Sequence, residues 1–118
     1  MAAPTRLEIV EVEGVRIIRF YDRHLFDEPT VREVSDQLFN AIPNNGKPIR
    51  LILDFSGVEL ISSSLIGKLI VLQRRVDASQ GKLRLCELSK TVDAVMKTTN
   101  LDRLFAIERD RAAALAAF

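Results

Sequence analysis

Three consecutive serines are the most prominent chemical feature of this sequence. Ser62, Ser63 and Ser64 follow an apolar segment and precede a run of leucines with helical spacing. Side-chain oxygens at such a place accept hydrogen bonds from the free N–H groups of a helix N-terminus, so capping alone explains serines there. The first turn of a helix also favours negative charge. Because a phosphate adds about −1.5 to −2 charges, a hydroxyl at this place suits a phosphorylation switch.

Other reactive side chains are scarce. His24 is the only histidine and Cys86 the only cysteine, which leaves neither an internal disulfide nor a four-ligand zinc site. We expect His24 to be a solvated loop residue, too isolated to serve as a catalytic base, and Cys86 to be a core residue of a strand. Neither G-x-x-x-x-G-K-[ST] nor G-x-G-x-x-G occurs. The sequence therefore predicts no enzyme activity, no metal and no cofactor.

Composition and length indicate a single globular domain. The 118 residues are 47% hydrophobic and 28% charged, with a net charge of +1. A nucleic-acid interface is not expected, because a basic stripe with interleaved aromatic residues is missing. The N-terminus lacks the pattern of a signal peptide, and no apolar run approaches the length of a membrane span. We therefore expect a cytoplasmic protein without membrane insertion, with one domain over residues 1–118.

The chemistry-bearing residues must be positioned by alternating strands and helices. Apolar patterns predict strands over residues 7–12, 15–21, 50–55, 82–88 and 104–107. Helices are predicted to begin after Asp27, at the three serines, after Ser89 and after Asp110. The predicted fold class is α/β: a mixed, mostly parallel sheet with an N-terminal antiparallel hairpin, covered by about four helices. In such sheets function gathers beyond the carboxyl ends of the strands, where the turn over residues 54–64 lies.

Several segments resemble one known family. The run LILDFSGVELISSSLIGKL, residues 51–69, resembles the core of STAS domains, named for sulfate transporters and anti-sigma factor antagonists. The segments SQGKLRLC at 79–86 and TNLDRLF at 99–105 are also similar to this family, as is Leu25-Phe26-Asp27 before a helix. The resemblance covers roughly residues 7–108 in order, and it leaves a C-terminal helix over about 109–118. It implies the STAS fold for the whole domain.

The resemblance also implies a function. In bacterial anti-sigma factor antagonists of this family, a partner kinase phosphorylates the second residue of a Ser-Ser/Thr pair. That position falls on Ser64, with Ser63 just before it. The unphosphorylated domain binds the serine kinase/anti-sigma factor, phosphorylation disrupts the complex, and a phosphatase restores it. The implied function is thus a non-enzymatic protein-interaction switch in transcription regulation.

Residues around the serines are candidates for partner binding. The family pattern has Asp where this chain has Ser62, and Gly where it has Leu65. We expect the first change to remove a helix cap and the second to shield the acceptor hydroxyl. Ile66 lies beside them, while Lys68 and Arg75 lie seven residues apart on the polar side of the predicted helix. These two form either a solvated basic face or a contact face for an acidic partner.

Two other functions remain open from the sequence. The chain could be a degenerate STAS subunit that docks in a transporter or lipid-trafficking complex without a phosphorylation cycle. A remoter alternative is a receiver-like domain phosphorylated on Asp54, which ends the predicted central strand. A receiver would also need an acidic pair after its first strand, but Glu11 and Glu13 lie at a hairpin turn. A homo-oligomer is compatible with either STAS function.

Overall fold

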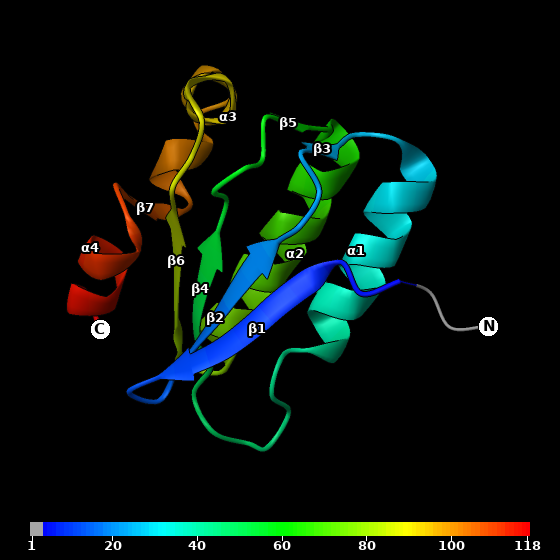
Figure 1. The fold of residues 1–118 in the computed structure, drawn as a ribbon. Coiled ribbons are helices and arrows are strands. Elements are labelled where there is room, and N and C mark those ends of the chain that lie inside the picture. The colour runs from blue at the N-terminus through cyan, green and yellow to red at the C-terminus, as the bar shows by residue number, and fades with distance from the viewer. Residues whose placement is uncertain (1–3) are drawn as a thin grey trace.

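A mixed five-stranded sheet forms the centre of the computed structural model, which describes residues 4–118. The strand order is β1-β2-β4-β6-β7 (Figure 1). β1 and β2 are antiparallel, and every other neighbouring pair is parallel. The strands are β1 (Leu7–Val12), β2 (Val15–Phe20), β4 (Arg50–Asp54), β6 (Lys82–Cys86) and β7 (Ala106–Glu108). This arrangement confirms the predicted fold class, including the N-terminal hairpin.

The hairpin turn follows from its two central residues. Glu13 has φ 53° and Gly14 has φ 78°, so both lie in the left-handed region that a two-residue type I′ turn requires. The turn pairs Val12 with Val15. This fixes the register of the two strands as far as the pair Leu7 and Phe20. β1 thereby becomes one edge of the sheet.

Residues 4–118 form four helices around the sheet, each opened by a side chain that caps its N-terminus. The helices are α1 (Glu28–Asn40), α2 (Ser63–Ala78), α3 (Lys90–Thr98) and α4 (Arg111–Ala116). Their caps accept a hydrogen bond from the N–H group three residues later and are Asp27, Ser62, Ser89 and Asp110. Within residues 4–118, no helix combines the length and the apolar character needed to cross a bilayer.

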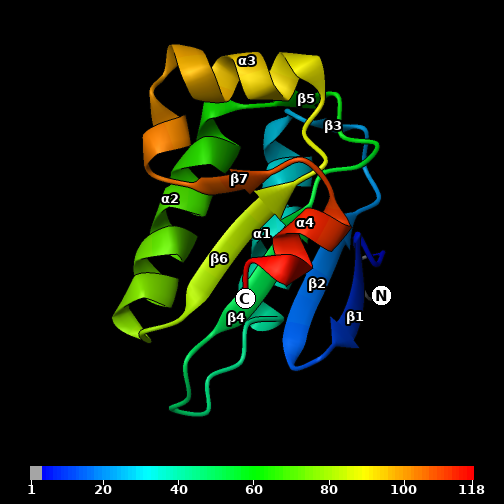
Figure 2. The ribbon, with the colours of Figure 1, turned by 90° about the vertical axis from the view of Figure 1, so that its left-hand side faces the viewer.

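The helices divide the core into two unequal parts. α1 and α2 lie against one face of the sheet, and the short α4 lies against the other (Figures 1 and 2). The main core fills the first side and includes the helix stripe Leu65, Leu69, Leu72 and Val76. A small cluster under α4 contains Val15, Ile17, Ile52, Cys86 and Ala114. β4 is buried on both faces, as its nearly uninterrupted apolar sequence predicts.

Two short strands were not predicted. β3 (His24–Leu25) pairs in parallel with β5 (Leu60–Ile61), separately from the main sheet. Two residues are too few to show an alternating pattern, so their pairing depends on how the flanking segments fold. This small sheet holds the segment that enters α2 beside the segment that enters α1.

Two predicted strands end one residue too late, at 21 and 55, and two others need larger corrections. β6 ends at Cys86 rather than Leu88, because Glu87 has φ 60° and leaves the extended conformation. The predicted strand over 104–107 is shifted to β7 at 106–108, after a 3₁₀ turn, η1 (Leu101–Arg103). Asn100 opens that turn at φ 59°, in the left-handed conformation that asparagine tolerates better than most residues.

Candidate functional site

The three serines have different roles at the start of α2. Ser62 is the N-cap, and its Oγ accepts a hydrogen bond from the N–H of Leu65 at 3.1 Å. The N–H of Ser62 donates to the carbonyl oxygen of Leu25 at 2.9 Å, which attaches this cap to β3. The expected loss of a cap at this position is therefore wrong, since Ser62 supplies one. Ser63 and Ser64 are the first two helical residues, and both are exposed.

The two apolar candidates beside the serines belong to the core. Leu65 is fully buried at 0% exposure, so it points away from the surface on which Ser64 lies. The expectation that Leu65 shields the hydroxyl is therefore wrong, and Leu65 offers no surface to a partner. Ile66 is half-buried and packs against the main core.

A hollow of about 180 Å³ lies between α1 and α2, and we call it the α1–α2 hollow. From α2 it is lined by Ser64 and Lys68; from α1 it is lined by Glu28, Val31, Arg32, Ser35 and Asp36. It brings together two of the predicted site residues, while Ser63 and Arg75 are not part of its lining.

Ser35 is the unusual member of this lining. Its side chain is only 3% exposed, and within residues 4–118 its Oγ has no hydrogen-bond partner. A buried hydroxyl normally has one, since leaving it unpaired costs about 1–3 kcal/mol. The sequence contained a signal that was missed, because Ser35 interrupts the apolar stripe of Val31, Val34 and Leu38.

Replacing Ser35 by alanine is expected to leave the stability unchanged or to raise it by up to about 1 kcal/mol, because the unpaired hydroxyl is removed and Ala favours helix. Urea denaturation of both chains measures this. A clear loss of stability in Ser35→Ala would show that the hydroxyl has a partner in solution.

Arg75 lies two helical turns beyond Lys68, on the side of α2 that faces α1. Its guanidinium carbon is 5.7 Å from the ring centroid of Phe39 on α1, the geometry of a cation–π contact. Arg75 thus rests on α1 while remaining exposed to solvent. Lys68 and Arg75 therefore share one exposed face, as their spacing predicts.

Two exposed apolar side chains flank the serines. Phe26 follows β3 and is 62% exposed, and Leu60 in β5 is 42% exposed. The pairing of β3 with β5 holds both segments beside the start of α2. We call Phe26, Leu60 and the residues Ser62–Ser64 the serine corner. Large exposed apolar side chains beside a polar rim are typical of protein contact surfaces.

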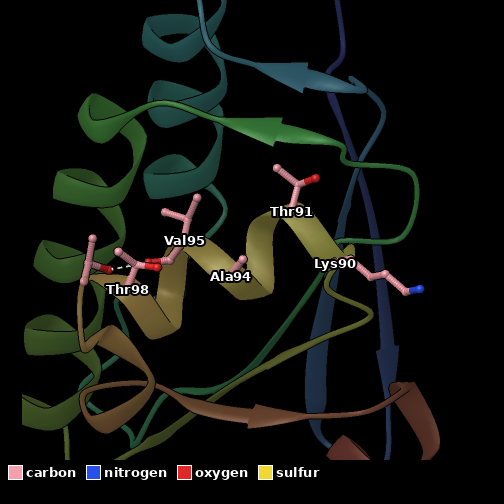
Figure 3. Close-up of a pocket in the computed structure, with 6 residues that line it drawn as sticks. Lys90, Thr91, Ala94, Val95 and Thr98 are labelled. Atoms are coloured by element: carbon pink, nitrogen blue, oxygen red, sulfur yellow. Dashed lines mark hydrogen bonds between the residues drawn. The ribbon is translucent and has the colours of Figure 1, made fainter.

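A second, larger hollow of about 580 Å³ runs along α3, which packs against β5. Its lining residues are Lys90, Thr91, Ala94, Val95, Thr98 and Thr99. Figure 3 shows Thr91 and Val95 directed toward the β3–β5 side of this helix. Its small, mostly uncharged side chains suit contact with a protein surface better than they suit an ion.

Asp54 has a structural role under α4. It is 3% exposed, and its Oδ2 accepts hydrogen bonds from Arg111 Nη2 at 2.7 Å and Nε at 3.1 Å. Its Oδ1 accepts one from the N–H of Ser56 at 2.8 Å. Burial by itself raises the pKa of Asp54, but the bonds from Ser56 and Arg111 outweigh it and hold the pKa below its usual range. A buried, paired carboxylate does not fit the phosphoacceptor of a receiver domain.

The single cysteine and histidine take no part in the serine corner. Burial, assisted by the negative charge of Asp54, raises the pKa of Cys86 to about 12, so the thiol stays protonated and unreactive. This confirms Cys86 as a core residue. His24 is exposed in β3, and its Nε2 lies 3.1 Å from Oε2 of Glu59.

Comparisons with known proteins agree with this fold. The family model described as the STAS domain matches residues 6–114. A STAS-domain anti-sigma-factor antagonist protein from Planctomyces limnophilus has a similar structure (TM-score 0.84, 23% identity, 94% of this chain and 96% of that one). So does a putative anti-sigma factor antagonist from Thermotoga maritima (TM-score 0.80, 21% identity, 94% and 92%). The anti-sigma factor antagonist SpoIIAA in its unphosphorylated form is also similar (TM-score 0.68, 21% identity, 91% of each chain).

Proposed function

Since this chain belongs to the STAS domain family, we propose that it is a cytoplasmic anti-sigma factor antagonist. In this proposal it performs no catalysis; it binds a serine kinase/anti-sigma factor through the serine corner. Phosphorylation of Ser64 releases the partner, and a phosphatase restores binding. The observation that carries the proposal is the exposed hydroxyl of Ser64 in the first turn of α2.

The surroundings of Ser64 support a switch at this position. Ser62 already caps α2, so the Ser64 hydroxyl is not needed to hold the helix start. The helix N-terminus tolerates a dianion, so phosphorylation leaves the fold intact. Phe26 and Leu60 beside it supply the apolar contacts of an interface. A phosphate inserted between such surfaces adds a desolvation cost and repulsion to the complex, which weakens it.

The direct test is phosphorylation by the kinase of the host organism. The chain is incubated with that kinase and ATP, and its intact mass is measured. We expect a gain of one phosphoryl group that is lost in Ser64→Ala and kept in Ser63→Ala. Absence of a Ser64-dependent gain, with the partner still bound, would favour a STAS subunit that docks without a phosphorylation cycle.

A negative charge at position 64 is expected to weaken partner binding at least about tenfold in Ser64→Asp, because it stands inside the contact surface. Titration calorimetry with the purified kinase measures the change. Ala112→Asp is the matched control, since Ala112 is the exposed second residue of α4, the same helix position that Ser64 has in α2. Equal binding of wild type and Ser64→Asp would contradict the switch.

Charge reversal on the α2 face is expected to slow partner association about tenfold in the double variant Lys68→Glu/Arg75→Glu. Both cations lie on the exposed side toward α1, and rim charges act mainly on the association rate. Stopped-flow mixing at low and high salt measures the rate and its salt dependence. Arg74→Glu is the control, because it reverses a single charge on the same helix. An unchanged association rate in the double variant would show that Lys68 and Arg75 form a solvated face that does not contact the partner.

A further inference from the structure

The α1–α2 hollow contains groups that suit a phosphate carried by its own wall. We propose that the phosphate of phosphorylated Ser64 binds within this hollow, where Lys68, Arg32 and the Ser35 hydroxyl hold it. This inference rests on the proposed function, because Ser64 is the residue that is phosphorylated there.

The positions of Ser64, Lys68 and Ser35 carry the inference. Ser64 and Lys68 are four residues apart on α2, so their side chains are neighbours on one helix face, and both line the hollow. Ser35 lines the hollow from α1 and is only 3% exposed. Within residues 4–118 its Oγ has no hydrogen-bond partner. A phosphate oxygen is an acceptor that this hydroxyl lacks at present.

The lining of the hollow has no net positive charge, so a phosphate must compete with its carboxylates for the two cations. Lys68 and Arg32 face Glu28 and Asp36, so the four charged residues of the lining sum to zero before phosphorylation. Arg32 Nη2 is 3.2 Å from Glu28 Oε1, and the two side chains are 70% and 79% exposed. Such a pair is weak, so a dianion with three acceptor oxygens is able to displace the Glu28 carboxylate from Arg32. The N-terminal dipole of α2 adds to the attraction.

Binding of the phosphate in the hollow gives phosphorylation a second effect on the partner surface. A phosphate held in the hollow pairs with Lys68 and Arg32, so their positive charges no longer attract an acidic partner. The switch then removes attraction from the face that α1 and α2 share, in addition to placing a negative charge at the serine corner.

The test uses the full chain with phosphoserine inserted at position 64 during translation, so it does not depend on any kinase. The pKa of the phosphate is measured by ³¹P NMR titration, since cations and donors that hold the dianion lower this pKa. We expect Lys68→Gln to change the protonation constant of the phosphate about threefold or more, and Arg32→Gln and Ser35→Ala about twofold each. Arg74→Gln is the control: it removes a positive charge from the same helix at a residue outside the lining, and we expect it to change nothing.

Removal of the phosphate by alkaline phosphatase provides a second measurement. A phosphate held in the hollow is protected, so we expect dephosphorylation to be about threefold faster in Ser35→Ala and Arg32→Gln than in the phosphorylated wild type. If only Lys68→Gln has an effect, the phosphate lies on the surface of α2 and the inference is overturned. The inference is also overturned if none of the three variants has an effect. Partner binding of the same phosphorylated chain tests the proposed function separately, because the NMR and phosphatase measurements contain no partner.

Discussion

Replacing Gly81 by alanine is expected to lower the free energy of unfolding by about 3 kcal/mol. A Cβ atom at Gly81 would lie 1.9 Å from the carbonyl oxygen of Ile49, and 2.6 and 2.7 Å from its nitrogen and carbonyl carbon. These are backbone atoms, and the same carbonyl accepts a hydrogen bond from Lys82 at 2.8 Å, so they cannot move without disturbing the start of β6. Guanidinium denaturation followed by circular dichroism measures the loss.

Gly67→Ala is the matched control for this substitution. Gly67 lies inside α2, is exposed, and has no atom within 4 Å of the position where a Cβ would stand. Alanine there is expected to stabilise the protein by about 0.5–1 kcal/mol, because glycine is a poor helix former. Wild-type stability in Gly81→Ala would contradict the close approach between residues 49 and 81.

Removing the Arg111 side chain is expected to destabilise the protein by about 2 kcal/mol, because Asp54 would remain buried with only one of its oxygens paired. The side chain of Arg111 is 35% exposed and that of Asp54 only 4%, so water only partly replaces the lost donor. We also expect α4 to detach from β4 and β6, since Arg111 is its first residue. Amide hydrogen exchange over residues 111–116 measures the detachment.

The same pair predicts a dependence on pH. The pKa of Asp54 in the folded chain is below its unfolded value, so its stabilisation is complete above the unfolded pKa and is lost as the pH falls through the folded pKa. Arg111→Ala raises that folded pKa, and the acid-induced loss of stability then begins at a higher pH. Arg109→Ala is the control, because Arg109 is 89% exposed and does not contact Asp54. Identical acid unfolding of Arg111→Ala and wild type would contradict this role of the pair.

The local structure was determined by the sequence, because its causes act over a few residues. A capping side chain and the N–H that it satisfies are three residues apart, so Asp27, Ser89 and Asp110 could each be placed at a helix start. The start of α2 could be placed at the three serines, but the cap formed by Ser62 was not predicted. The helical period also places Leu65 on the apolar stripe that faces the core, which the expectation of a shielded Ser64 hydroxyl overlooked. The strand order at the hairpin was readable from its two-residue turn.

Only the tertiary structure decided which distant groups meet. Ser35 and Ser64 line one hollow because α1 and α2 pack side by side on the sheet, and no local pattern reports that contact. Asp54 and Arg111 are 57 residues apart, and their pairing depends on α4 returning across the sheet. Phe26 and Leu60 flank the serines because two-residue strands pair, which needs the surrounding chain already in place. Such contacts form when several elements pack together, and short-range patterns in one sequence do not record them.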